Sequence, residues 1–172
     1  MKDVIFSSWE GQVVDSRDGS ETDSIASKEM GWPEKLNETE PIKAFMGWDG
    51  FVIHSEDVHV VDLCRAYMEA VRNQSCGKCI PCQTGTTVMV KTLEAICSGQ
   101  GRASDIVYLR DIAETVHRTA KCGIGKTGPL PILQALTYFP DQFADLVDAK
   151  RTLTPGQYHA SVTAPCMEAC PI

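Results

Sequence analysis

Three cysteines in one short run constrain this chain more than any other feature of its sequence. The segment Cys76-Gly77-Lys78-Cys79-Ile80-Pro81-Cys82 has the spacing C-x2-C-x2-C. This spacing lets three thiolates converge on one [4Fe-4S] cubane from a single tight loop. Gly77 allows the backbone to turn closely around the cluster, and Pro81 stiffens the loop. The chain must then bring a fourth ligand to this loop.

Cys122 is the predicted fourth ligand, because it lies in a glycine-rich segment directly after a predicted helix. That helix runs from a Ser104 cap to about Ala120, and the helix before it covers Thr86 to Cys97. The two helices have comparable lengths, so a hairpin returns Cys122 to the cysteine loop. The sequence therefore predicts one [4Fe-4S] cluster bound by Cys76, Cys79, Cys82 and Cys122.

A structural zinc site is the alternative, since four thiolates also suit Zn²⁺. Structural zinc more often draws on two separate two-cysteine knuckles than on three cysteines in one run. The corresponding alternative function is a zinc module that joins subunits, and an iron-sulfur sensor is a further one. Disulfides are the weakest interpretation in a chain without a signal sequence. Cys64 and Cys97 fall at apolar positions of predicted helices and are expected in the core.

The apolar periodicity predicts a mainly α fold, a small helical bundle with one short strand. The strand is expected within Phe45 to His54, and the first helix follows a Ser55 or Asp57 cap and reaches about Asn73. Prolines at first-turn positions place two more helices at the end of the bundle. The other expected helices cover Thr86 to Cys97, Ser104 to Ala120, Pro129 to Tyr138 and Pro140 to Ala149.

The bundle is expected over residues 46–150, between two less regular segments. Residues 1–45 hold twice as many acidic as basic residues and form an acidic, partly ordered arm, irregular in structure. Trp9 and Trp32 indicate that parts of this arm dock on another surface, because indoles are costly to leave in water. Residues 151–172 are expected to be a linker that ends in a partial second cysteine motif.

Charge and hydropathy exclude two classes of partner. The chain has 16 basic and 23 acidic residues, a net charge of −7, which repels a phosphate backbone. No nucleic acid is therefore expected as a partner. No apolar run reaches the roughly 18–20 residues of a membrane-spanning helix, and the N-terminus lacks the apolar core of a signal peptide. We expect a cytoplasmic protein without direct membrane insertion.

The sequence resembles the C-terminal iron-sulfur domain of the NADH-binding flavoprotein subunit of respiratory complex I, and of related soluble hydrogenases and formate dehydrogenases. The resemblance covers about Phe45 to Val147. It depends on the motif from Ser75 to Gly85, on Cys122-Gly123-Ile124-Gly125 before a proline-led helix, and on the ending from Phe139 to Phe143. It implies that the four cysteines bind a [4Fe-4S] cluster that takes electrons from a flavin.

The resemblance also implies partners, because the flavin and nicotinamide domain of that family should precede this region and the acidic arm is too short to supply it. FMN or FAD and NAD(P)H are therefore expected only on partner domains or subunits, along with other iron-sulfur proteins. The C-terminal Cys166-x3-Cys170-Pro171 is similar to the start of the iron-sulfur region that precedes the flavoprotein part of glutamate synthase small-subunit relatives. That similarity implies a fused NAD(P)H oxidoreductase and a second cluster completed outside this sequence. The alternative is a tail whose two thiols bind nothing.

Other motif matches lack their required context. Gly123 to Gly128 matches G-x-G-x-x-G but follows a helix and a metal ligand, not a buried strand. The four histidines are scattered, and the carboxylates show no spacing typical of a general acid and base. We expect no catalytic residue in this chain. The sequence thus predicts an electron-transfer component of an oxidoreductase that relays single electrons between a flavin and another redox centre.

Overall fold

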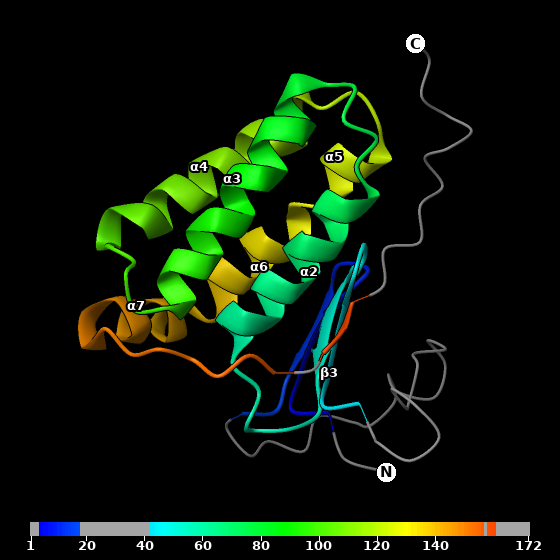
Figure 1. Cartoon of the computed structure of the whole chain (residues 1–172). Helices are drawn as coiled ribbons and strands as arrows, with labels where there is room; N and C mark the ends of the chain where they lie inside the picture. Colours follow the sequence, from blue (N-terminus) through cyan, green and yellow to red (C-terminus); the bar gives the residue numbers. More distant parts are fainter. Residues whose placement is uncertain (1–3, 18–41, 157, 161–172) are drawn as a thin grey trace.

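A small β-sheet packs against a helical bundle in a computed structural model that describes residues 4–17, 42–156 and 158–160 (Figure 1). The strands are β1 (Phe6–Trp9), β2 (Gln12–Asp15), β3 (Ala44–Gly47), β4 (Gly50–Ile53) and β5 (His159–Ala160). Their order across the sheet is β2-β1-β4-β3-β5. All neighbouring pairs are antiparallel except β3 and β5, which are parallel.

Two tight hairpins build most of this sheet. Glu10 and Gly11 join β1 to β2 with positive φ angles of 48° and 79°, as two-residue hairpin turns require. Trp48 and Asp49 join β3 to β4. The single strand expected within Phe45 to His54 is therefore a hairpin, and two further strands lie in the segment expected as an arm.

Pairing with β4 explains why β1 is ordered. Phe6 lies opposite Ile53, and Trp9 lies opposite Gly50. Phe6 is fully buried, with its ring 5.3 Å from the Phe51 ring. The predicted docking of Trp9 is confirmed, because its ring lies 5.3 Å from that of Phe45. Trp32 lies outside the described residues.

The helices account for most of the described chain, and the predicted mainly α class is confirmed. The first, third, fourth and fifth predicted helices have the expected extents within a few residues. None of the described helices is long and apolar enough to cross a lipid bilayer. The helices are α2 (Val60–Gln74), α3 (Ile80–Cys97), α4 (Ala103–Thr119), α5 (Gly123–Thr127), α6 (Leu130–Tyr138) and α7 (Pro140–Ala149).

The helix starts show where the sequence rules failed. The predicted Ser55 or Asp57 cap of α2 is wrong, because these two side chains bond to each other. The first turn of α2 is instead capped from α7, where Gln142 Oε1 accepts the Val60 N–H at 2.8 Å. α3 begins at Ile80, six residues before the expected Thr86, since Cys79 is its N-cap and Pro81 lies in its first turn.

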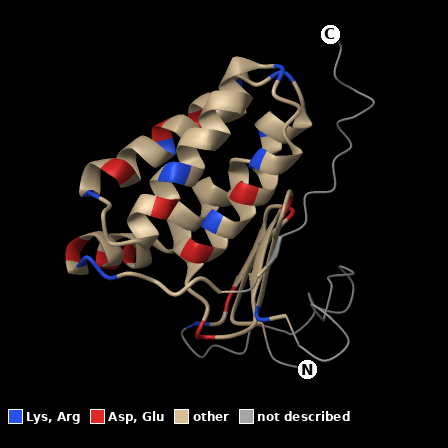
Figure 2. Ribbon diagram, in the orientation of Figure 1, with Lys and Arg blue, Asp and Glu red and all other residues tan. Residues whose placement is uncertain are grey.

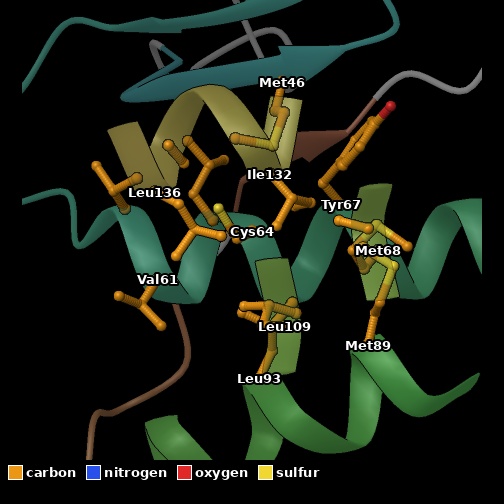
Figure 3. Packing of buried hydrophobic residues seen from close by; sticks show 14 of the residues in the cluster. Met46, Val61, Cys64, Tyr67, Met68, Met89, Leu93, Leu109, Ile132 and Leu136 are labelled. Atoms are coloured by element: carbon orange, nitrogen blue, oxygen red, sulfur yellow. The ribbon is translucent and has the colours of Figure 1, made fainter. Parts of the chain in front are cut away.

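Helix α2 is the centre of the core. It packs against α3 on one side and against α6 and the sheet on the other (Figure 3), and α4 packs against both α3 and α6. Tyr67 and Cys64 are fully buried on α2, next to Met46 of β3 and Leu136 of α6. The largest buried side chains come from all of these elements: Tyr67, Phe6, Phe51, Phe143, Met46, Leu63, Met68, Met89, Leu93, Ile96, Leu109 and Ile132.

The segment after α7 is fixed across the end of the bundle. The Leu153 N–H donates to Cys97 O at 2.8 Å, and the Gly156 N–H donates to Asp62 Oδ2 at 2.6 Å. Asp62 is 1% exposed, and its other oxygen accepts from Arg65 Nε at 2.6 Å. Part of the predicted linker is therefore ordered, and it leads into β5. The predicted division at residues 45 and 150 stays a prediction.

Candidate metal centre

The three clustered cysteines span the junction between α2 and α3. Ser75 is the C-cap of α2, and Gly77 turns the chain with a φ of 70°, which a side chain would strain. Cys79 is the N-cap of α3, and Cys82 lies in the first turn of that helix. The expected tight loop is thus half loop and half helix start, which fixes the third cysteine on a rigid element.

Cys122 is brought to the same corner by the predicted hairpin of α3 and α4 (Figure 1). It is the N-cap of α5, a one-turn helix that follows α4 after a short bend. The contact with α3 is direct, because a Cβ built on Gly125 would lie 3.3 Å from Cys82 Cβ and 3.6 Å from Cys82 Sγ. Glycine at this position lets α5 approach the cysteine segment closely.

The four predicted ligands differ in exposure. Cys82 and Cys122 are 3% and 8% exposed, Cys79 is half-buried, and Cys76 is exposed. A group held here would have one side in the protein and one side near the surface. Burial of the thiols on one side lowers the local dielectric, which is one of the ways in which proteins set the potential of an iron-sulfur cluster.

Electrostatics show that the four thiols share one neighbourhood. Burial raises the pKa of Cys82, and the hydroxyl of Ser75 lowers it. The thiols of the other three predicted ligands each raise this pKa further, because each would place a like charge near a Cys82 thiolate. The N-terminus of α3 carries a positive dipole end, which favours thiolates at this position.

Positive charge surrounds this corner of an acidic chain. Lys78, Lys121 and Lys126 are exposed, and the segments 75–82 and 119–129 contain no aspartate or glutamate. Figure 2 shows basic and no acidic colour on the loops that join α2 to α3 and α4 to α5. These charges offset the negative charge that four thiolates bring together.

The donor set fits an iron-sulfur cluster. All four groups are sulfur, and they come from two segments that touch through Gly125. Ligands of a cubane bind four separate irons, so they lie farther apart than ligands that share one ion. Within the described ranges, no three histidine, cysteine, aspartate or glutamate side chains converge as the ligands of a single metal ion.

The remaining cysteines separate into two groups. Cys64 and Cys97 are 0% and 7% exposed, as expected for core residues, and burial raises the pKa of Cys97 to about 12. Cys166 and Cys170 lie outside the described residues. Gly123 to Gly128 forms α5 and its C-cap, not the strand-turn-helix unit of a dinucleotide site.

The sequence alone did not predict a role for two residues of this corner, Ser75 and Gly125. Ser75 has its Oγ 3.3 Å from Cys82 Sγ, and Gly125 lies against Cys82. The serine precedes the first cysteine directly, so its contact depends on how the junction folds. Nothing local to either residue signals these contacts.

Comparisons with known proteins relate this chain to an iron-sulfur family. The family described as "NADH-ubiquinone oxidoreductase-F iron-sulfur binding region" matches residues 62–146, which include all four predicted ligands. The chain is 34% identical to the NADPH-Fe(3+) oxidoreductase subunit beta of Geobacter sulfurreducens, over 99% of this chain and 25% of that protein. It is 33% identical to the NADP(+)-dependent formate dehydrogenase subunit beta of Moorella thermoacetica, over 91% of this chain and 21% of that one.

A solved structure shares the fold. The chain aligns with an NAD+-reducing [NiFe]-hydrogenase in its H2-reduced state, with a TM-score of 0.51 and 24% identity. The alignment covers 62% of this chain and 18% of the hydrogenase chain. The chain thus spans a quarter or less of the length of these relatives.

Proposed function

Because residues 62–146 belong to the family of the NADH-ubiquinone oxidoreductase-F iron-sulfur binding region, we propose that this chain is the electron-relay part of an NAD(P)H-linked oxidoreductase. The proposed ligands hold one [4Fe-4S] cluster at the corner where α2, α3 and α5 meet. When bound, such a cluster accepts and releases one electron at a time. The ligands are Cys76, Cys79, Cys82 and Cys122.

One observation carries this proposal: four thiols from two segments share a single corner of the fold. The exposure gradient from Cys82 to Cys76 leaves one side of that corner open to a partner. Ile80 lies between two of the proposed ligands and is 76% exposed, so a partner can make an apolar contact beside the cluster. The chain's own role is to bind the cluster, to bury one side of it and to offset its negative charge with nearby lysines.

We place the electron donor, a flavin, on a partner domain or subunit. The relatives are named as subunits of NADPH-, NADP- and NADH-dependent oxidoreductases, and this chain spans only part of each. FMN or FAD and NAD(P)H then bind the partner, and a further iron-sulfur protein accepts the electron. Cys64 and Cys97 are thiols outside the proposed cluster, and such thiols suit a reducing compartment, so we propose the cytoplasm.

A second cluster is part of the same proposal. Cys166 and Cys170 follow β5 by a few residues, and their remaining ligands come from residues or a chain outside this sequence. Two cysteines cannot complete a four-thiolate site. The chain then links one cluster in its bundle to another at its C-terminal side.

Electron transfer from a reduced flavin tests the relay directly. The chain is reconstituted with iron and sulfide under anaerobic conditions and mixed with photoreduced FMN in a stopped-flow instrument. We expect the broad visible absorption of the oxidised cluster to bleach as FMN is reoxidised, with one electron taken up per chain. A protein that binds zinc in place of iron, or a cluster that FMN cannot reduce, contradicts the proposal.

A further inference from the structure

Ser75 connects the end of α2 to the start of α3 through one hydroxyl. Its Oγ lies 3.3 Å from Cys82 Sγ and also accepts the Gly77 N–H at 3.3 Å. Both contacts are partly buried, so water competes with them less than at an exposed site. The serine is the C-cap of α2, which fixes its backbone.

The chemistry of the three groups sets the direction of the hydrogen bond to sulfur. A hydroxyl has one proton and two lone pairs, and the Gly77 N–H can only donate. Gly77 therefore occupies a lone pair of Ser75 Oγ and leaves the hydroxyl proton for Cys82. A thiolate that binds iron has no proton to give, so Ser75 is the donor.

Such a hydrogen bond discriminates between redox states. One added electron increases the negative charge on the cluster and its thiolates, and hydrogen bonds to more negative acceptors are stronger. The reduced state gains more from the Ser75 hydroxyl than the oxidised state does.

We propose that Ser75 is a positioning residue that donates its hydroxyl proton to Cys82 Sγ and thereby raises the reduction potential of the cluster. This inference rests on the proposed function, because it needs a cluster on Cys82. The electron comes from the reduced partner, no bond is broken, and the proton stays on the Ser75 oxygen throughout. The residue tunes electron affinity without touching the iron.

A redox titration followed by EPR tests this on the full chain, reconstituted with iron and sulfide. The variants are Ser75→Ala, which removes the hydroxyl, and Ser75→Thr, which keeps it. Ser98→Ala is the matched control, because Ser98 Oγ donates to Ala95 O at 3.0 Å at the other end of α3. Iron and sulfide content is measured for each protein, so that potentials are compared at equal occupancy.

We expect Ser75→Ala to lower the ratio of reduced to oxidised cluster about tenfold at the wild-type midpoint, which is a shift of ~59 mV for one electron. Ser75→Thr and Ser98→Ala should keep the wild-type midpoint. An unchanged midpoint in a fully occupied Ser75→Ala protein overturns the inference and leaves the proposed function intact. Wild-type protein that binds no cluster contradicts the proposed function itself.

If Ser75→Ala retains no cluster, resonance Raman spectra of the wild type and Ser75→Thr in H2O and D2O give the answer. The hydroxyl proton that Ser75, or the threonine of Ser75→Thr, donates to Cys82 Sγ makes an iron–Sγ stretching band sensitive to deuterium in both proteins. Spectra without any isotope-sensitive iron–Sγ band overturn the inference.

Discussion

Gly125 packs directly against Cys82: a Cβ built on Gly125 would lie 3.3 Å from Cys82 Cβ and only 2.3 Å from Ala120 Cβ. Both neighbouring atoms are attached to backbone, so neither can rotate away. The segment that carries Cys122 is thereby held against the first turn of α3. Close approach at one glycine positions the proposed fourth ligand.

Gly125→Ala should displace α5 from both Ala120 and Cys82. The added methyl overlaps Ala120, and overpacking of this kind costs about 1–3 kcal/mol of stability. Helix propensity alone predicts the opposite, since alanine is better than glycine within a helix by about 1 kcal/mol. The urea unfolding midpoint measures the loss of stability, and the iron content measures the displacement of Cys122. We expect both to be lower than in the wild type.

Gly123→Ala is the matched control in the same short helix. A Cβ at Gly123 meets no atom within 4 Å. Stability should stay at the wild-type level or rise by up to about 1 kcal/mol, and iron content should not change in this variant. Equal behaviour of the two glycine variants would contradict the close approach that we assign to Gly125.

Gly85 and Val116 set the distance between α3 and α4. A Cβ on Gly85 would lie 2.1 Å from Val116 Cγ2, and a β-branched side chain in a helix has little freedom to move. Gly85→Ala should therefore destabilise the chain by about 1–3 kcal/mol. In Gly85→Ala/Val116→Ala the offending methyl is gone, so the double variant should be more stable than the sum of the two single changes predicts. Strict additivity in urea unfolding would show that the helices do not meet there.

Arg17 fixes the N-terminal hairpin to the junction of α6 and α7. Its guanidinium lies 4.4 Å from the Phe139 ring centre and 5.3 Å from that of Phe6, and it donates to Tyr138 O at 3.1 Å. We expect Arg17→Ala to cost about 1–2 kcal/mol, and Arg17→Lys to recover only part of it, because lysine lacks the planar fork. Thermal unfolding measures the loss.

Arg118→Ala is the control for Arg17, since its side chain is 74% exposed and lies 3.6 Å from Glu114. Exposed pairs on a helix contribute about 0.3–0.5 kcal/mol. A loss as large as that of Arg17→Ala would mean that the hairpin is not anchored by the stacked guanidinium.

His59 should make the fold sensitive to mild acid. Burial lowers its pKa, Asp62 and Asp145 raise it, and Arg151 lowers it. The folded pKa is therefore below the unfolded value of ~6.5. Above pH ~6.5 the contribution of neutral His59 to the free energy of unfolding is fully present. This contribution is lost as the pH falls below ~6.5, because the unfolded chain takes up the proton first.

The variant His59→Gln should remove this part of the pH dependence. Urea midpoints measured between about pH 8 and about pH 5.5 should fall less for the variant than for the wild type. Identical slopes for the two proteins would contradict a depressed pKa. No described residue offers a hydrogen-bond partner to His59 Nδ1, which agrees with a neutral ring.

Local signals located most of the bundle. The proline rule that placed α6 and α7 depends on residues within one turn, and both helices begin where it predicts. The same rule applied to Pro81 finds the true start of α3. Because Pro81 was interpreted only as part of the metal-binding loop, the start of α3 was predicted at Thr86 and not at Ile80.

Non-local contacts explain what the sequence did not show. β1 pairs with β4, which lies more than forty residues away along the chain, so no local pattern predicts this pairing. The turn at Glu10-Gly11, between two β-prone runs, is a local signal from which the β1–β2 hairpin could have been predicted. The start of α2 depends on Gln142 of α7. α5 consists largely of poor helix formers and forms against Ala120 and Cys82, so periodicity could not reveal it.

Metal analysis of single cysteine variants tests the central claim most directly. Each proposed ligand and each core cysteine, Cys64 and Cys97, is changed to serine, and iron and acid-labile sulfide are measured after anaerobic reconstitution. We predict about four irons and four sulfides per chain in the wild type and in both core variants, with Cys122→Ser and the three loop variants losing the intact cluster. A wild type with one zinc and no sulfide, or a Cys122→Ser protein with an unchanged cluster, would contradict the account.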